Sequence, residues 1–291
     1  MPMPMPGWAL LLAAGVAGAA AGLSVLGRRR WQRATAALVD RLRQAEDGRP
    51  APPVDLARAT EGLPAPVQRY LRAVLTDGAP RIRGVSLAHR GRFNLGSDPQ
   101  APRWKPFRSQ QVVVTRRPGF VWDGRIAILP GLAALVHDAY VAGEGRLQAT
   151  LAGLLTLADQ RGGAALAEGE LMRFLAESPW YPTVLLPGQG VTWAAVDEVT
   201  ATATLRDGEV QVQLHFVFGA DGLVAAVRAD ARGRTVGERS VPTPWEGRWA
   251  RYEWQDGLRV PMDGEVAWQL PQGELPYWRG TVTALTVRWA R

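Results

Sequence analysis

Residues 210–218 read VQVQLHFVF, and every second side chain of this stretch is apolar. The apolar positions are Val210, Val212, Leu214, Phe216 and Phe218. Successive side chains of a β-strand point to opposite faces of a sheet, so the alternation predicts a strand with one buried face. Asp207-Gly208 and Asp221-Gly222 flank the stretch, and such pairs are typical of hairpin turns. The segment therefore predicts one strand of an antiparallel sheet.

The same pattern extends in both directions from this strand. Downstream, Asp256-Gly257 and Gln272-Gly273 indicate two more turns. Upstream, alternating or β-prone stretches predict strands over 83–95, 108–115 and 120–128, and 138–159 continues in that way. Short strands with frequent turns are typical of an antiparallel meander and not of βαβ units. The fold class expected is mainly β, within the α+β group.

Two stretches within this region have helical periodicity, 64–75 and 164–177. A sheet with one apolar face and few helices to cover it twists and curls, which predicts a curved meander or half-barrel. The 164–177 helix would then pack inside the curve or across its mouth. We expect residues 63–291 to form a single globular domain whose concave face could hold an apolar ligand.

The amino-terminal segment differs from the rest of the chain. Residues 8–27 carry no charge, and Arg28-Arg29-Arg30 ends the run. A helix of this length covers about 30 Å, the thickness of a bilayer core, so residues 1–30 predict a membrane anchor. A cleaved signal peptide is the alternative, although residues 1–7 lack the usual basic residues. Residues 31–62 would form a juxtamembrane helix followed by a Pro-rich linker.

Charge asymmetry gives an orientation for this anchor. Of the net charge of +7, residues 28–43 contribute +5, so the remaining domain is nearly neutral. Positive flanks stay on the cytoplasmic side, which predicts a single-pass protein of the bacterial inner membrane with its domain in the cytoplasm. A periplasmic domain remains the alternative. The near-neutral domain excludes nucleic acid as a partner, and the membrane is the partner expected.

Catalytic and metal-binding motifs are missing from the sequence. It contains no cysteine, and His89, His137 and His215 are isolated from one another. Nucleophile elbows, Walker loops and dinucleotide fingerprints do not occur either. We therefore expect no cofactor, no metal and no catalytic residue, and favour a protein that is not an enzyme.

Glu170, Arg173 and Glu177 form the most informative polar set, because spacings of three and four place them on neighbouring helical turns. One interpretation is a solvated helix face with ion pairs. The other is a cavity wall, where the glutamates could act as acid and base or Arg173 could hold a carboxylate or phosphate. Four aromatic residues are further candidate ligand contacts, with packing as their alternative: Trp180, Tyr181, Trp245 and Trp278.

Several segments resemble the signatures of an uncharacterised bacterial family of unknown function, whose members typically have an amino-terminal hydrophobic segment. They are LPAPVQRYL (63–71), ELMRFLAESPWYPT (170–183), PWEGR (244–248) and PYWRG (276–280). The resemblance covers about residues 60–285 and implies no activity. A weaker similarity, carried by 210–227, Trp249-x-x-Tyr252 and 256–261, is to the curved-sheet carriers of lipoprotein sorting. That similarity implies a periplasmic half-barrel that holds acyl chains.

These observations leave three functional hypotheses. The first is a membrane-tethered domain that binds a lipid or another apolar ligand without catalysis. The second is a protein-interaction module at the membrane surface with a closed core. The third is a hydrolase-like enzyme that uses Glu170 and Glu177. The sequence leaves the ligand and the oligomeric state open.

Overall fold

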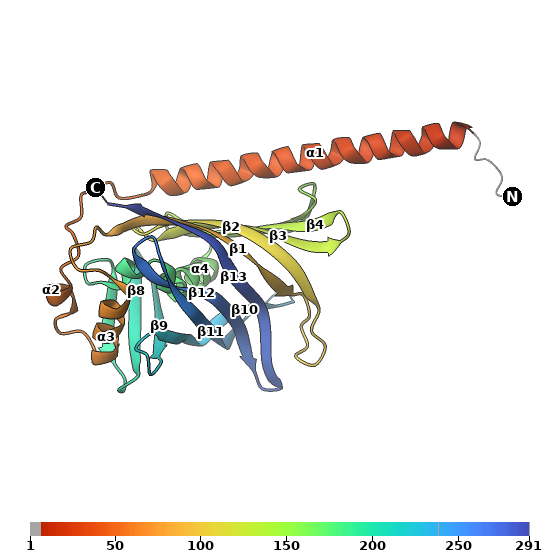
Figure 1. The fold of residues 1–291 in the computed structure, drawn as a ribbon. Helices are drawn as coiled ribbons and strands as arrows, with labels where there is room; N and C mark the ends of the chain where they lie inside the picture. Colours follow the sequence, from red (N-terminus) through yellow and green to blue (C-terminus); the bar gives the residue numbers. More distant parts are fainter. Residues whose placement is uncertain (1–6, 238, 291) are drawn as a thin grey trace.

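The computed structural model describes residues 7–237 and 239–290, and in this part of the chain thirteen strands form a single antiparallel sheet (Figure 1). The strands are β1 (Ile82–Asn94), β2 (Trp104–Val114), β3 (Gly119–Leu129), β4 (Leu132–Val141), β5 (Glu144–Leu151), β6 (Leu155–Arg161), β7 (Val191–Ala195), β8 (Thr200–Asp207), β9 (Val210–Phe218), β10 (Val224–Val236), β11 (Arg239–Gln255), β12 (Leu258–Leu270) and β13 (Gly273–Trp289). The predicted fold class, mainly β with a curved antiparallel sheet, is confirmed.

Two meanders make up the sheet, β1–β6 and β7–β13, and they join where β1 pairs with β13. The two edges are therefore β6 and β7, which follow each other in the chain. The segment between them contains α4 (Ala164–Ala176) and the 3-10 turns η1 (Ser178–Trp180) and η2 (Pro182–Leu185). α4 lies inside the curve of the sheet (Figure 1) and contacts β9 and β10 on one side and β4 and β5 on the other. One helix thus fills the concave side, as expected.

The alternating stretch quoted first forms β9. Its Val212, Leu214, Phe216 and Phe218 are buried in the main core, and Gln211 and Gln213 are exposed. The predicted turns fall between β8 and β9, β9 and β10, β11 and β12, and β12 and β13. Gly208, Gly222 and Gly257 have φ values between +59° and +82°, a conformation that glycine adopts without strain.

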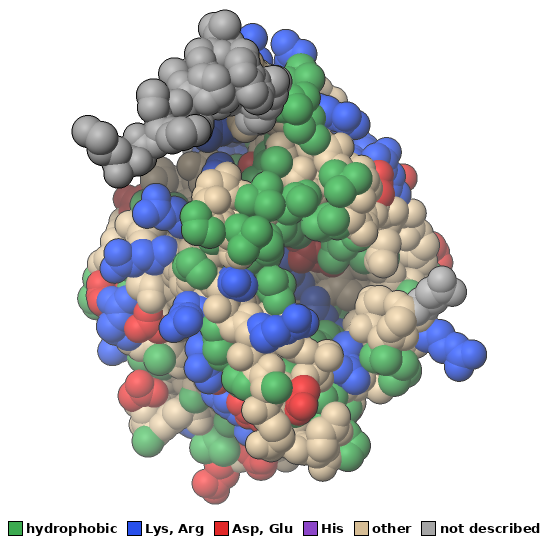
Figure 2. Space-filling view, turned by 90° about the vertical axis from the view of Figure 1, so that its right-hand side faces the viewer, with side chains coloured by type: hydrophobic (Ala, Val, Ile, Leu, Met, Phe, Trp, Pro, Cys, Tyr) green, Lys and Arg blue, Asp and Glu red, His purple; other side chains and the backbone are tan. Residues whose placement is uncertain are grey.

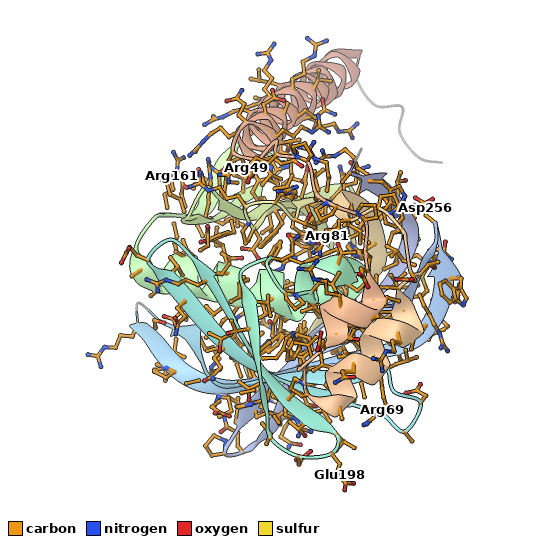
Figure 3. All side chains as sticks on the ribbon, turned by 90° about the vertical axis from the view of Figure 1, so that its left-hand side faces the viewer. Arg49, Arg69, Arg81, Arg161, Glu198 and Asp256 are labelled. Carbon is orange, nitrogen blue, oxygen red and sulfur yellow. The ribbon has the colours of Figure 1, made fainter. Side chains whose placement is uncertain are left out.

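Two short helices, α2 (Leu56–Thr60) and α3 (Ala65–Val74), close one end of the curved sheet (Figure 1). Val67, Tyr70 and Leu71 of α3 are fully buried in the main core. Seen from this end, Arg69 of α3 lies near the Glu198 turn (Figure 3), and its Nη2 donates to the Glu198 carbonyl at 2.8 Å. These helices therefore cover the core at this end of the sheet.

A single long helix, α1 (Gly7–Gln44), precedes the domain and packs on the outer, convex face of β2, β3 and β4. The Trp31 ring stacks on the His137 ring at a centroid distance of 3.7 Å, and its Nε1 donates to Asp123 at 2.9 Å. Leu38 and Leu42 are buried among valines of β2–β4. The helix expected after residue 31 is thus continuous with the segment before it and attached to the sheet.

The membrane span expected over about residues 8–27 falls on the first part of α1. Several of its side chains, including those of residues 8–14, lie outside the described part of the structure. Within the described part, no helix is long and apolar enough to cross a membrane. The predicted span is therefore not supported. The physical reason is composition: the stretch is rich in alanine and glycine, which are less apolar than leucine and isoleucine, so it is only moderately hydrophobic for a membrane span.

Candidate functional site

A cavity of about 950 Å³ lies between α4 and the concave face of the sheet. On the side of β3, β4 and β5 its wall is aliphatic, with Ile126, Ile128, Ala134, Val136, Leu147 and Ala149. On the side of β11, β12 and β13 it is aromatic, with Trp245, Trp249, Trp268, Tyr277 and Trp278. Most of these residues lie at alternate positions of their strands, because every second side chain of a strand faces inward. Tyr277 and Trp278 are consecutive and lie at a register shift between β12 and β13. The interaction-module hypothesis expected a closed core, whereas the structure has a cavity here.

The mouth of the cavity has apolar side chains at its rim. Leu95 and Leu157 line the cavity and are at least one-third exposed, at 38% and 55%. Leu129 and Leu155, both 61% exposed, lie at the neighbouring turns between β3 and β4 and between β5 and β6. Figure 2 shows hydrophobic side chains gathered in the middle of this face, with Lys and Arg side chains around them and a hollow beside them. The cavity is thus open to solvent at an apolar rim.

A polar cluster occupies the inner side of the cavity, where α4 meets β4 and β2. Arg173 forms ion pairs with Asp138 and with Glu177, the latter at 2.8 Å. The second oxygen of Glu177 accepts from Gln111 Nε2 at 2.6 Å. The Arg173 guanidinium also lies 4.9 Å from the Phe120 ring centroid. Burial alone would lower the pKa of Arg173, but the carboxylates of Glu177 and Asp138 outweigh it and raise that pKa. Arg173 is a permanent cation whose charge is already neutralised.

Glu170 lies one turn before Arg173 and is only 5% exposed. Burial, followed by the neighbouring carboxylate of Asp138, raises the pKa of Glu170 well above its ordinary value. Glu170 Oε2 and Asp138 Oδ1 are buried and have no hydrogen-bond partner in the described structure. Both effects favour the uncharged form of the Glu170 carboxyl group.

The structure decides between the two interpretations of this helix face. Glu170, Arg173 and Glu177 do not form a solvated face, because all three line the cavity and the side chains of Arg173 and Glu177 are 17% and 12% exposed. The expected Arg173–Glu177 pair is present. Glu177, however, is held by Arg173 and Gln111. The neighbouring carboxylate that raises the pKa of Glu170 is that of Asp138.

The aromatic wall contains a second arginine, Arg232 of β10. Its guanidinium lies 5.1 Å from the Trp245 ring centroid and 5.9 Å from that of Trp268. One terminal nitrogen donates to the Gly169 carbonyl of α4 at 3.1 Å, and the other lies 3.4 Å from the Tyr277 hydroxyl. Tyr277 also accepts from Trp245 Nε1 at 2.9 Å. Among the residues the structure describes, Arg232 has no carboxylate within ion-pair distance.

Glycines position three of the inward-facing tryptophans. In each case the ring lies over a glycine two residues later in the same strand, so a Cβ there would meet the ring at less than 3.0 Å. The pairs are Trp122 with Gly124, Trp245 with Gly247 and Trp278 with Gly280. A side chain at each of these glycine positions would face inward, as the tryptophan does. Its absence leaves room for the ring to lie flat against the strand.

Six of the seven candidate residues line this cavity, namely Glu170, Arg173, Glu177, Trp180, Trp245 and Trp278. Tyr181 does not line it. Its ring is fully buried in the main core, and its hydroxyl donates to the Phe174 carbonyl of α4 at 2.7 Å. Trp180 is held by a hydrogen bond from its Nε1 to the Pro261 carbonyl at 2.8 Å. These aromatic residues both build the core and bound the cavity.

Sequence reasoning missed Asp138 and Arg232, which lie on strands far from α4 in the chain. Neither has a local pattern that marks it. The Trp-x-Gly spacing at 122–124, 245–247 and 278–280 was the available signal for the aromatic wall. In the described residues, no group of three or more His, Cys, Asp or Glu is arranged to hold a metal ion.

This curved sheet and its cavity belong to a class of domain that has been recognised but not assigned an activity. Residues 61–286 match the model of the family of unknown function DUF6920. The chain belongs to this family, as the segments from Leu63 to Gly280 led us to expect. No curated protein matches the sequence.

Solved structures with similarity to the chain include proteins from three bacteria. A DUF1329 family protein from Desulfovibrio piger has a TM-score of 0.39 at 13% identity, over 71% of this chain and 86% of that one. A LolA superfamily protein from Nitrosomonas europaea has a TM-score of 0.31 at 12% identity, over 72% and 87%. A beta-barrel-like DUF1849 protein from Brucella abortus has a TM-score of 0.23 at 9% identity, over 72% and 100%.

Proposed function

We propose that this domain binds a lipid or another apolar ligand in the cavity under α4 and does so without catalysis. The observation that carries the proposal is the cavity itself, about 950 Å³ in volume and bounded by aliphatic strands on one side and tryptophans on the other. This volume lies at the upper end of the range of small-molecule sites, which are mostly apolar with a few placed polar groups. An apolar chain of a ligand fits against Ile126, Val136 and Leu147.

We further propose that the mouth of the cavity lies against a membrane surface. The exposed leucines 129, 155 and 157 at the rim match the interfacial region of a bilayer, into which apolar side chains can insert. Arg28, Arg29 and Arg30 are exposed on α1, and arginines near a bilayer attract anionic headgroups by about 1 kcal/mol each. The same arginines favour the cytoplasmic face of the bacterial inner membrane for the domain. A ligand would then enter without crossing water.

One experiment tests both parts. The delipidated full chain is mixed with phosphatidylglycerol vesicles, floated, released with high salt and weighed by native mass spectrometry. We expect the protein to float and, after release, to carry a lipid mass that solvent extraction removes. In Ala149→Trp the new ring would fill the aliphatic side of the cavity, so this variant should float equally but carry about tenfold less lipid, a difference of about 1.4 kcal/mol in binding.

The matched control is Ala284→Trp, which adds the same ring at an exposed position of β13 outside the cavity. It should carry lipid as the wild type does. A wild-type chain that floats but is released without added mass would contradict ligand binding. A chain that acquires lipid without floating would contradict only the membrane placement.

A further inference from the structure

We infer that Arg232 binds the single anionic head, a carboxylate or a phosphate monoester, of the amphiphile whose apolar chain fills the cavity. This inference rests on the proposed function and specifies the ligand class. It assigns a residue that the helix-face pattern did not indicate.

Arg232 has donors left over after its structural contacts. A guanidinium carries five N–H donors in a fixed planar fork. In the described structure one donor of Nη2 is used by the Gly169 carbonyl, and Nη1 makes one long contact with Tyr277. The remaining donors have no hydrogen-bond partner among the residues that the structure describes, and the side chain lines the cavity. A carboxylate or phosphate oxygen pair is the group that such a fork binds most strongly.

The surroundings of Arg232 hold the guanidinium in place without neutralising it. Trp245 and Trp268 pack against it, and Tyr277 is fixed in turn by the Trp245 indole. Aromatic faces attract a cation but supply no counter-charge. The charge of Arg232 acts on one carboxyl group of α4, that of Glu170, but burial and Asp138 outweigh this effect and raise the Glu170 pKa, which favours its uncharged form. The site therefore presents one uncompensated positive charge.

Arg173 does not compete for the head. It is paired with both Asp138 and Glu177, so these three side chains together carry one positive and two negative charges. An anion entering this cluster would meet a net negative charge. The role of holding a carboxylate or phosphate, which the sequence suggested for Arg173, is therefore assigned to Arg232. The apolar chain then points away from Arg232, toward the aliphatic wall of β3–β5.

A fluorescent probe pair tests this inference on the full chain. Dansylaminoundecanoic acid carries a carboxylate, and its methyl ester is the same molecule without the charge. We expect wild type to bind the acid at least tenfold more tightly than the ester, as one charge-assisted hydrogen-bonded pair provides. Arg232→Gln should abolish this preference by weakening the binding of the acid and not that of the ester. Arg232→Lys should keep part of the preference. Dodecanoate and dodecyl phosphate should displace the probe, whereas dodecanol should do so weakly and inorganic phosphate should not.

The control is Arg228→Gln, which removes the same charge from the same strand. Arg228 pairs with Glu246 at 2.6 Å and does not line the cavity, so the acid preference should remain. If Arg232→Gln weakens acid and ester equally, or neither, Arg232 does not bind the head and the inference is overturned. If wild type binds neither probe, the proposed function itself is wrong. Displacement by inorganic phosphate alone would identify a free anion, not an amphiphile, as the ligand.

Discussion

The two arginines of the cavity occupy opposite electrostatic situations although both face the same space. Arg173 on α4 is paired with two carboxylates and lies against Phe120 and Trp122. Arg232 on β10 lies against Trp245 and Trp268, with hydrogen-bonding partners that are all neutral. The aromatic contacts are alike, and the counter-charges differ. We conclude that Arg173 belongs to the protein's own structure and that Arg232 is available to something the protein binds.

A protein tolerates a charge near its interior in two ways, by pairing it within the chain or by leaving it in contact with water. A buried charge costs several kcal/mol of desolvation, which its partners must offset. Arg173 has those partners inside the chain. Arg232 is half-buried, so water at the mouth solvates it until a ligand arrives. Loss of each side chain should therefore damage a different property.

The largest effect is expected from Arg173→Gln. This change leaves Asp138 and Glu177 buried without their cation, and breaking such a pair on one side costs about 3–5 kcal/mol of folding free energy. Urea unfolding followed by tryptophan fluorescence measures it. The control is Arg251→Gln, which breaks an exposed pair with Asp263 and should cost much less folding free energy, because water screens that pair. A loss at Arg173 no larger than at Arg251 would mean that the cluster is solvated.

Adding Asp138→Asn and Glu177→Gln to Arg173→Gln sharpens the same test. The triple variant has no buried charge to desolvate, so it should regain a large part of the lost stability. A triple variant less stable than Arg173→Gln would show that the carboxylates stabilise the fold by contacts other than this ion pair.

An intermediate effect is expected from Glu170→Gln, and it depends on pH. Because the pKa of Glu170 is raised in the folded state, its contribution to stability is complete below about pH 4.5, the unfolded value, and declines as pH rises. Glutamine cannot ionise, so the variant should match wild type near pH 5. Above pH 8 it should be more stable, because wild type loses about 1.4 kcal/mol per pH unit between the unfolded and the folded pKa of Glu170.

Unfolding curves of wild type and Glu170→Gln across pH 5–9 measure this difference. Buried His89, whose pKa burial lowers to about 3, changes stability with pH in the opposite sense, but it is present in both proteins and cancels. Glu144→Gln, at an exposed end of β5, should show no such trend. A difference that stays constant with pH would contradict a protonated Glu170.

Much of this architecture was predictable from local patterns. The alternation of 210–218, the Asp-Gly turns and the helical spacing of 164–177 each reflect one element, and the meander follows when neighbouring elements pair. What joins the elements was not predictable in this way. The pairing of β1 with β13 closes a contact between residues nearly two hundred positions apart, and no local pattern encodes it.

The site divides along the same line. Glu170, Arg173 and Glu177 share a helix, so their spacing alone predicted that they would lie together. Asp138 is placed beside them only by the curl of β4 around α4. Arg232 comes from the opposite meander and meets α4 at Gly169. Whether a helix face meets solvent or a cavity depends on these long-range contacts, which explains why its burial was left undecided by the sequence.

The smallest effect on stability is expected from Arg232→Gln. The contacts that would be lost are two aromatic contacts and weak hydrogen bonds to neutral groups. Partly exposed cation–π contacts contribute about 0.5–1 kcal/mol each, and glutamine can keep one hydrogen bond to Gly169. We expect a loss of about 1 kcal/mol of folding free energy in ligand-free protein.

Dodecanoate at a hundred times its dissociation constant should stabilise wild type by about 2.7 kcal/mol and the variant by much less. Thermal unfolding with and without dodecanoate measures both quantities. A loss of 3 kcal/mol or more without ligand would place Arg232 in the same structural role as Arg173, because an arginine free to bind a ligand cannot also be one that the empty fold needs.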